Sequence, residues 1–206
     1  MPESAEEAYA RVVALVGTDG RLPTSPLHEW DTFPWEGDLA TKVVRPPVAA
    51  EEPRHGEGGK PCWRCENPDV NAIWRNERWQ VATTRQPTGL PLVLFLESRE
   101  HLDFTDMDDT LASEYGRITN NLHRIMARLP NIGRVHVCKW GDGSAHLHTW
   151  FMARTERFTQ TLGSYAAEWD EVLPPVPEDV WRADLVVVAD RLATHDGGAV
   201  IGRTGR

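Results

Sequence analysis

Residues 140–154 constrain the fold of this chain more than any other stretch, because a glycine-rich loop there runs directly into a strand-like segment. The loop has the sequence WGDGS, and small residues let backbone N–H groups approach a ligand closely. The residues that follow alternate apolar and polar types and include several aromatic ones, which predicts a strand. Because side chains alternate along a strand, one face is predicted to carry His146, His148 and Trp150, and the other Leu147 and Phe151, toward a core.

Two histidines separated by one residue, directly after a glycine-rich loop, are typical of a polar site that a plain core strand does not need. A half-exposed strand whose histidines are only hydrogen-bonded carries the same short pattern, so the residues alone leave both interpretations open.

The stretch resembles the signature of the histidine triad superfamily, in which His-x-His-x-His lies in a glycine-rich loop and strand. It resembles still more the galactose-1-phosphate uridylyltransferase branch, whose motif is His-x-His-x-Gln after a Gly-x-Ser segment. The three motif positions here are His146, His148 and Trp150, with Gly143-Ser144 just before, so the third position departs from both patterns. The match covers residues 62–154 and implies the α+β histidine triad fold, with helices packed on an antiparallel sheet.

Composition limits the classes of partner. The chain has 206 residues, of which 40% are hydrophobic, which is enough for one sizeable core. Its net charge of -9 argues against general binding to nucleic acid or to an anionic membrane, which needs a basic face. No apolar run reaches the roughly 18 residues of a membrane helix, and the acidic start MPESAEE lacks the plan of a signal peptide, so a cytoplasmic location is expected.

The chain divides into three predicted parts. Residues 1–60 are expected to form a helix, begun by a capping box between Ser4 and Glu7, and then a Pro/Gly-rich arm. Residues 61–154 are the predicted histidine-triad-like core domain, and residues 155–206 are a C-terminal helical extension of the same domain.

Local patterns predict the elements of the core and its extension. Strands are expected at 72–74, 79–83, 90–96 and 135–139, and helices at 111–129, 162–173 and 180–192. The order of these elements predicts an α+β fold with an antiparallel sheet: several strands come first, followed by a helix, a further strand, the glycine-rich loop and a last strand.

The pair Cys62-x-x-Cys65 lies on a segment expected to be turn-like, between Pro61 and Asn67-Pro68. Two thiolates at this spacing can reach one tetrahedral ion, whereas a redox pair is expected at a helix start after a strand. Two unpaired thiols are the third alternative. The uridylyltransferase resemblance implies His101 and His146 as the other two ligands, and four protein ligands make a closed, structural zinc site.

The resemblance also implies a chemistry. It makes His148 the nucleophile that attacks the α-phosphorus of a nucleotide, giving a nucleotidyl-histidine. Phosphate and nucleotide contacts are expected from Lys139, Gly143, Ser144 and Trp150, although Ser144 in a turn caps the backbone equally well. Indole cannot relay a proton, so weak hydrolysis is expected for substrates whose leaving group needs protonation.

Three functions remain open. The first is a nucleotidyl transferase or hydrolase with a nucleotide or nucleotide-sugar substrate, in a chain that the resemblance suggests is a homodimer. The second is a catalytically inactive nucleotide-binding or interaction module on the same zinc-stabilised scaffold. The third is a thiol redox protein that uses Cys62 and Cys65.

Overall fold

The computed structural model describes residues 3–24 and 26–201, and the chain forms two compact units, Met1–Glu52 and Pro53–Arg206. In the first unit, α1 spans Ala5–Val13 and a 3-10 helix spans Pro26–Glu29. The predicted capping box is present: the Glu7 N–H donates to Ser4 Oγ at 3.1 Å, and the Ser4 N–H donates to Glu7 Oε2 at 2.7 Å. These bonds satisfy backbone donors that a helix start leaves without partners.

The second unit is built on a six-stranded antiparallel sheet with the order β4-β5-β3-β2-β1-β6. The strands are β1 (Ala72–Arg75), β2 (Trp79–Thr83), β3 (Leu92–Ser98), β4 (Ile132–Cys138), β5 (His148–Thr155) and β6 (Gly198–Ala199). The α+β class with an antiparallel sheet is therefore confirmed, as are the strands expected at 72–74 and 79–83.

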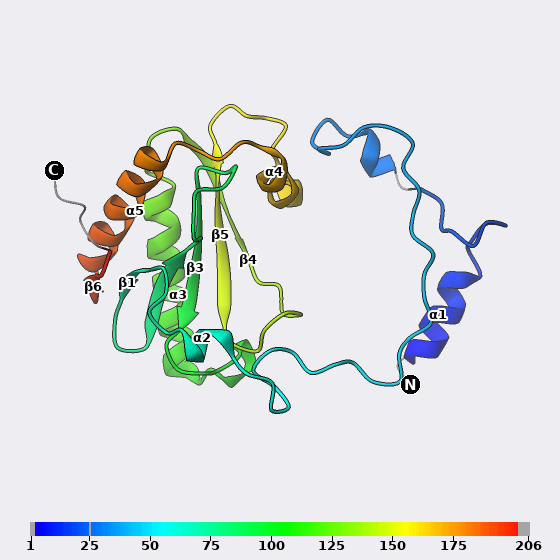
Figure 1. Ribbon diagram of the computed structural model, residues 1–206, viewed down its shortest axis with the longest axis horizontal. Coiled ribbons are helices and arrows are strands. Elements are labelled where there is room, and N and C mark those ends of the chain that lie inside the picture. The colour runs from blue at the N-terminus through cyan, green and yellow to red at the C-terminus, as the bar shows by residue number, and fades with distance from the viewer. Residues whose placement is uncertain (1–2, 25, 202–206) are drawn as a thin grey trace. The chain divides into compact units, whose positions relative to one another are not determined.

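Two long helices, α3 (Asp109–Met126) and α5 (Glu178–Ala193), cover one face of the sheet (Figure 1). The helix α3 begins at its N-cap Asp108, whose Oδ1 accepts a hydrogen bond from the Leu111 N–H at 2.8 Å, and it ends before Pro130. Its buried residues Ile118 and Leu122 pack into the main core with Leu147 and Phe151, as their predicted strand face requires.

The opposite face of the sheet is only partly covered. The short helix α4 (Ala166–Val172), preceded by a 3-10 turn at Gly163–Tyr165, packs there through Ala167 against a small cluster of Leu90, Val93 and Met152. The aromatic rings of Phe95 and Trp150 extend this cluster. His148 alternates onto the same face as Trp150, so the histidine lies on the more open side of the sheet.

The strand β5 begins at His148, two residues later than predicted. The preceding residues pair with other segments: the Leu147 N–H donates to Leu102 O at 2.7 Å, and the Ala145 N–H donates to His55 O at 2.9 Å. His146 is therefore held at the entrance to the strand, where its ring turns toward the segment that carries the cysteines.

Within the described part of the chain, no helix combines the length and the apolar character needed to cross a membrane.

Candidate metal centre and nucleotide pocket

Four side chains from three separate segments meet at one end of the sheet. Cys62 is the N-cap of the single-turn helix α2 (Trp63–Glu66), Cys65 lies in that turn, His101 follows β3, and His146 precedes β5. One ligand atom from each residue lies within 4.8 Å of the others. The group of Cys62, Cys65, His101 and His146 fits a structural zinc ion, as the ligand types and the closed set of four require.

The separations within this group match tetrahedral coordination. The Nδ1 atom of His146 lies 3.4 Å from Cys62 Sγ and 3.6 Å from Cys65 Sγ, and the Nδ1 atom of His101 lies 3.4 Å from Cys65 Sγ. Zinc bond lengths of about 2.3 Å to sulfur and 2.0–2.1 Å to nitrogen place two such ligands about 3.5 Å apart at a tetrahedral angle. The observed sulfur–nitrogen separations therefore match those expected between ligands of one zinc ion.

A backbone carbonyl sets the tautomer of His146. Its Nε2 lies 2.8 Å from Ser98 O, and a carbonyl only accepts, so Nε2 carries the hydrogen and Nδ1 presents its lone pair to the thiols. Burial lowers the pKa of His146, and the hydrogen bond to the Ser98 carbonyl opposes this effect. A lowered pKa favours the neutral ring that a metal ligand needs.

The same geometry disfavours the redox interpretation. Cys62 and Cys65 do begin a helix, contrary to the turn-like expectation, but the two imidazole nitrogens face their sulfur atoms. The pKa of Cys65 is raised to about 11, first because its sulfur is partly removed from water and second because the Cys62 thiol lies beside it. A redox-active cysteine needs a lowered pKa, and the pKa of Cys65 is raised instead.

Gly56 lets a further segment approach this group closely. Its φ of +92° is in the region that favours glycine, and a Cβ built there would lie 2.6 Å from Cε1 of His101. Residues 53–60 can therefore run beside His101 only with glycine at this position, a requirement that the sequence pattern did not reveal.

A pocket of about 420 Å³ opens beside the metal-ligand group. Its lining residues are His55, Trp63, Arg64, Asn71, Thr83, Thr84, Arg85, Phe95, Glu97, Ser144, His146 and His148. The volume falls in the range of small-molecule sites, and the lining combines aromatic rings with a few charged groups.

His148 is oriented in this pocket by its neighbour in the motif. Its Nδ1 lies 2.8 Å from the carbonyl oxygen of His146, so Nδ1 carries the hydrogen and donates it. In the neutral ring the lone pair therefore resides on Nε2, which takes no part in this hydrogen bond. A neutral imidazole in a fixed tautomer is the form that acts as a nucleophile.

A buried acidic residue, Glu97, is paired with His148 on the neighbouring strand. Glu97 on β3 pairs in register with His148 on one side and with Gln80 on the other. Its Oε1 accepts from Arg64 Nη2 at 2.9 Å, and its Oε2 accepts from Gln80 Nε2 at 2.9 Å. Burial raises the pKa of Glu97, and the Arg64 guanidinium opposes that rise. Motif reasoning missed Glu97 because only the strand register brings it beside the histidine.

Two of the predicted phosphate-binding residues belong to the loop that borders the pocket. Ser144 lines the pocket, and its Oγ accepts from the His146 N–H at 3.2 Å. The carbonyl oxygen of Gly143 accepts from the His55 N–H at 3.2 Å, so this end of the loop is tied to residues 53–60.

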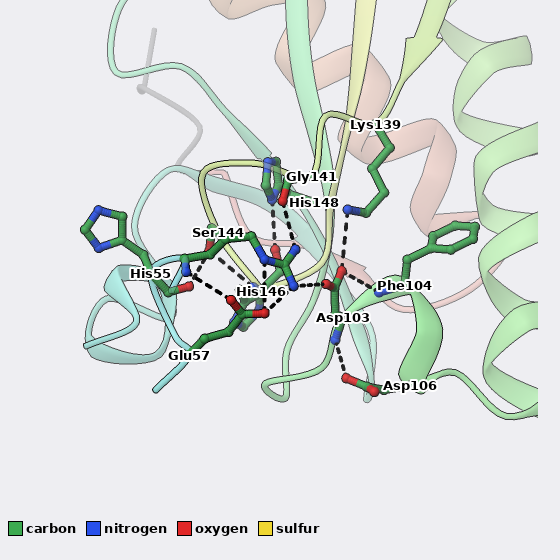
Figure 2. Close-up of polar contacts among 11 residues, drawn as sticks. His55, Glu57, Asp103, Phe104, Asp106, Lys139, Gly141, Ser144, His146 and His148 are labelled. Carbon is green, nitrogen blue, oxygen red and sulfur yellow. Dashed lines mark hydrogen bonds and ion pairs between the residues drawn. The ribbon is translucent and has the colours of Figure 1, made fainter. Parts of the chain in front are cut away.

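The amino group of Lys139 lies 3.4 Å from Asp103 Oδ1, at the far end of a polar network that Figure 2 shows. Arg54 completes this network through Asp103 Oδ2 at 2.7 Å and the carbonyl oxygen of Gly141 at 2.8 Å, and it also pairs with Glu57. The network anchors both ends of residues 139–141 close to the metal-ligand group.

The indole ring of Trp150 packs edge-to-face against two other aromatic rings. Its centroid lies 4.6 Å from that of Phe95 and 5.5 Å from that of Trp140, in edge-to-face arrangements. Among the described residues that line the pocket, Trp150 is absent while Phe95 is present. The indole of Trp150 therefore contacts the pocket lining through Phe95, its cross-strand partner.

Solved structures resemble the fold of this chain. A hypothetical histidine triad nucleotide-binding protein from Sulfolobus tokodaii has a TM-score of 0.45 and 10% identity, over 64% of this chain and 90% of that one. A zinc-bound histidine triad family protein from Mycobacterium smegmatis has a TM-score of 0.45 and 14% identity, over 66% of this chain and 97% of that one. The neighbours are histidine triad proteins.

No protein-family model matches the chain, and no curated protein sequence is significantly similar to it. The functional assignments below therefore rest on the positions of this chain's own residues.

Proposed function

We propose that this protein is a nucleotidyl transferase or hydrolase that acts through a nucleotidyl-histidine at His148, in the manner of the galactose-1-phosphate uridylyltransferase branch. The observation that carries the proposal is the tautomer of His148: its Nδ1–H is held by the His146 carbonyl at 2.8 Å, and its Nε2 is left with the lone pair. The substrate is a small nucleotide or nucleotide sugar, bound in the pocket that His148 and Ser144 line.

The first step is attack of Nε2 on a phosphorus atom, with departure of the group that the phosphorus carried. Ser144 lines the pocket with His148, and we expect its hydroxyl, whose hydrogen bond to His55 O is long at 3.4 Å, to turn and donate to the phosphoryl oxygens. Attack turns the neutral ring of His148 into a cation, since Nδ1 keeps its hydrogen while Nε2 becomes bonded to phosphorus. The Glu97 carboxylate, in register across the sheet, stabilises that positive charge.

We assign no bond-making step to the metal. Cys62, Cys65, His101 and His146 would fill all four coordination positions of a zinc ion, which would therefore supply structure alone. Such ligation would hold His146 in place, and the carbonyl of His146 in turn orients His148.

The position of Trp150 favours the second candidate, an inactive nucleotide-binding module. The third motif position is packed against Phe95 and Trp140 and offers no titratable group to a leaving group. The two candidates differ in one respect: a binding module takes up nucleotide without forming a covalent adduct.

Turnover assays separate these functions. The protein is incubated with nucleoside phosphoramidates, dinucleoside polyphosphates and nucleotide sugars, and product release is followed by chromatography. We expect turnover of at least one class, a loss of 10³-fold or more in His148→Ala, and wild-type rates in His195→Ala, a matched change at an exposed histidine beyond the end of α5. Nucleotide binding without turnover by the wild type would support the binding module instead.

A further inference from the structure

When the leaving group is an alcohol or an amine, the proposed reaction needs a proton for that group, and the motif contains no residue to supply it. Both oxygens of Glu97 are bonded to Arg64 and Gln80, His146 faces the cysteines, and His148 is the nucleophile. The remaining charged residues of the lining are arginines, which do not give up a proton in proteins. Of the described pocket residues, His55 is the one titratable side chain that these roles leave unassigned.

The backbone of His55 is attached to the glycine-rich loop from outside the motif. Its N–H donates to Gly143 O at 3.2 Å, and its carbonyl accepts from the Ala145 N–H at 2.9 Å. These bonds form a parallel bridge between His55 and Ser144. His55 therefore keeps a defined place beside the residue that is expected to hold the phosphoryl group.

The residues on either side of His55 are also fixed. Arg54 bonds to Gly141 O at 2.8 Å and to Asp103 Oδ2 at 2.7 Å, and Gly56 lies against the ring of His101. The segment is thus anchored to the loop and to the metal-ligand group at once, while the His55 side chain itself is exposed.

Ser144 lies between His55 and His148. The Ser144 Oγ accepts from the His146 N–H, and the His146 carbonyl accepts from His148, while the bridge ties Ser144 to His55 on its other side. Figure 2 shows the same order, with the ring of His55 extending beyond Ser144 on the side away from His148. In an in-line displacement at a phosphoryl group held by Ser144, the leaving group departs on the side opposite the nucleophile.

We propose that His55 is the catalytic acid that contacts and protonates the leaving group, in place of the third motif position. The proposal rests on the proposed function, and it replaces the expectation that substrates with poor leaving groups are hydrolysed weakly. It predicts a substrate class: nucleoside 5′-monophosphates esterified or amidated with an alcohol, a sugar or an amine, whose leaving atom needs a proton.

The proton balance closes over two steps. The Nε2 lone pair of His148 bonds to phosphorus, the bond from phosphorus to the leaving atom breaks toward that atom, and protonated His55 gives the atom a proton. Neutral His55 then takes a proton from water as the water oxygen bonds to phosphorus. The P–N bond breaks, its electron pair returns to Nε2, and both histidines regain their starting states.

The test compares two adenosine and two uridine 5′-monophosphate esters that differ only in the leaving group. One ester of each pair releases 4-nitrophenol, which leaves without protonation, and the other releases ethanol, which requires it. The variants are His55→Ala, His55→Gln and the control His195→Ala, each checked for zinc content and thermal midpoint.

For the ethyl esters, we expect kcat/KM to fall by about 10²-fold or more in both His55 variants, because general acid catalysis is worth about 10²–10⁴-fold. For the 4-nitrophenyl esters, we expect a fall of less than about tenfold, with an undiminished covalent adduct at His148. Equal losses on both esters, or no loss on either, would overturn the role of His55 while leaving the histidine intermediate in place. Absence of any adduct from the 4-nitrophenyl esters in the wild type would overturn the proposed function and this proposal together.

Discussion

The carbonyl oxygen of His146 accepts the Nδ1–H of His148 at 2.8 Å, so one histidine of the motif directly orients the other. The ring of His146 faces the two cysteines, and its Nε2–H is held by Ser98 O at 2.8 Å. A metal-ligand position and the proposed nucleophile are thus coupled through a single peptide carbonyl. Loss of metal should therefore disturb catalysis without any direct contact between metal and substrate.

The first prediction concerns zinc. We expect about one zinc per chain in the purified protein, and loss of zinc in a Cys62→Ser/Cys65→Ser variant, with a fall in unfolding free energy of several kcal/mol, because binding of a structural zinc is linked to folding. Elemental analysis and thermal denaturation measure both. Cys138→Ser is the control, since Cys138 lies on β4 outside the ligand group. Full zinc content and an unchanged thermal midpoint in the double variant would refute the site.

Alanine variants of the two motif histidines should have different effects on zinc binding and on turnover. His146→Ala is expected to lose zinc and stability, because it removes a buried ligand. His148→Ala is expected to keep zinc and lose turnover, because the Nδ1–H of His148 donates to a carbonyl and its ring is absent from the ligand group. Zinc loss in His148→Ala, or zinc retention in His146→Ala, would contradict this division of roles.

The buried ion pair between Arg64 and Glu97 gives a stability prediction. Glu97→Gln leaves the Arg64 guanidinium buried without its counter-charge, at an expected cost of about 3 kcal/mol. The matched change Glu178→Gln breaks an exposed pair with Arg182 and should cost less than about 1 kcal/mol. Urea denaturation of both variants gives the comparison. Equal losses of unfolding free energy in the two variants would show that the buried pair contributes no more to stability than the exposed one.

Glu97→Gln should also slow the first chemical step. The negative charge that this change removes would stabilise the cation that His148 is proposed to become, so adduct formation is expected to slow while zinc content stays unchanged. Rapid-quench measurement of adduct formation reports this rate. An unaltered rate in a correctly folded variant would exclude Glu97 from the reaction.

Acid sensitivity of the fold should depend in part on His136. Burial lowers the pKa of His136, and the nearby Arg154 guanidinium lowers it further. The unfolded chain thus binds a proton more readily than the folded chain, so this contribution to stability is complete above the unfolded pKa of about 6.5 and is lost as the pH falls below it. We expect His136→Leu to have a shallower loss of unfolding free energy between about pH 7 and pH 5 than the wild type. Parallel curves for the two proteins would contradict the assignment.

Sequence reasoning succeeded where a pattern is repeated along one segment. The alternation at Leu147 and Phe151 predicted their burial, and the apolar stripe predicted α3 to within a few residues of its ends. The metal-ligand group was predicted from the Cys-x-x-Cys spacing and the resemblance, and the structure brings its four members together.

Residues whose roles depend on pairing between distant segments were missed. His55 reaches the pocket through a backbone bridge to Ser144, and Glu97 reaches His148 through strand register. Gly56 is required by the approach of residues 53–60 to His101. No local period or spacing records such contacts. The late start of β5 has the same origin, because residues 145–147 take their backbone partners from His55 and Leu102.

The most direct test of the account is to locate a covalent nucleotide on the protein. After incubation with the uridine and adenosine 4-nitrophenyl esters, the reaction is stopped in alkali, where a phosphoramidate bond to histidine survives, and the protein is digested and mapped by mass spectrometry. We expect one nucleotidyl group, on His148, that is absent in His148→Ala and is released by mild acid. A nucleotide attached to another residue, or rapid turnover with no adduct at any time point, would contradict it.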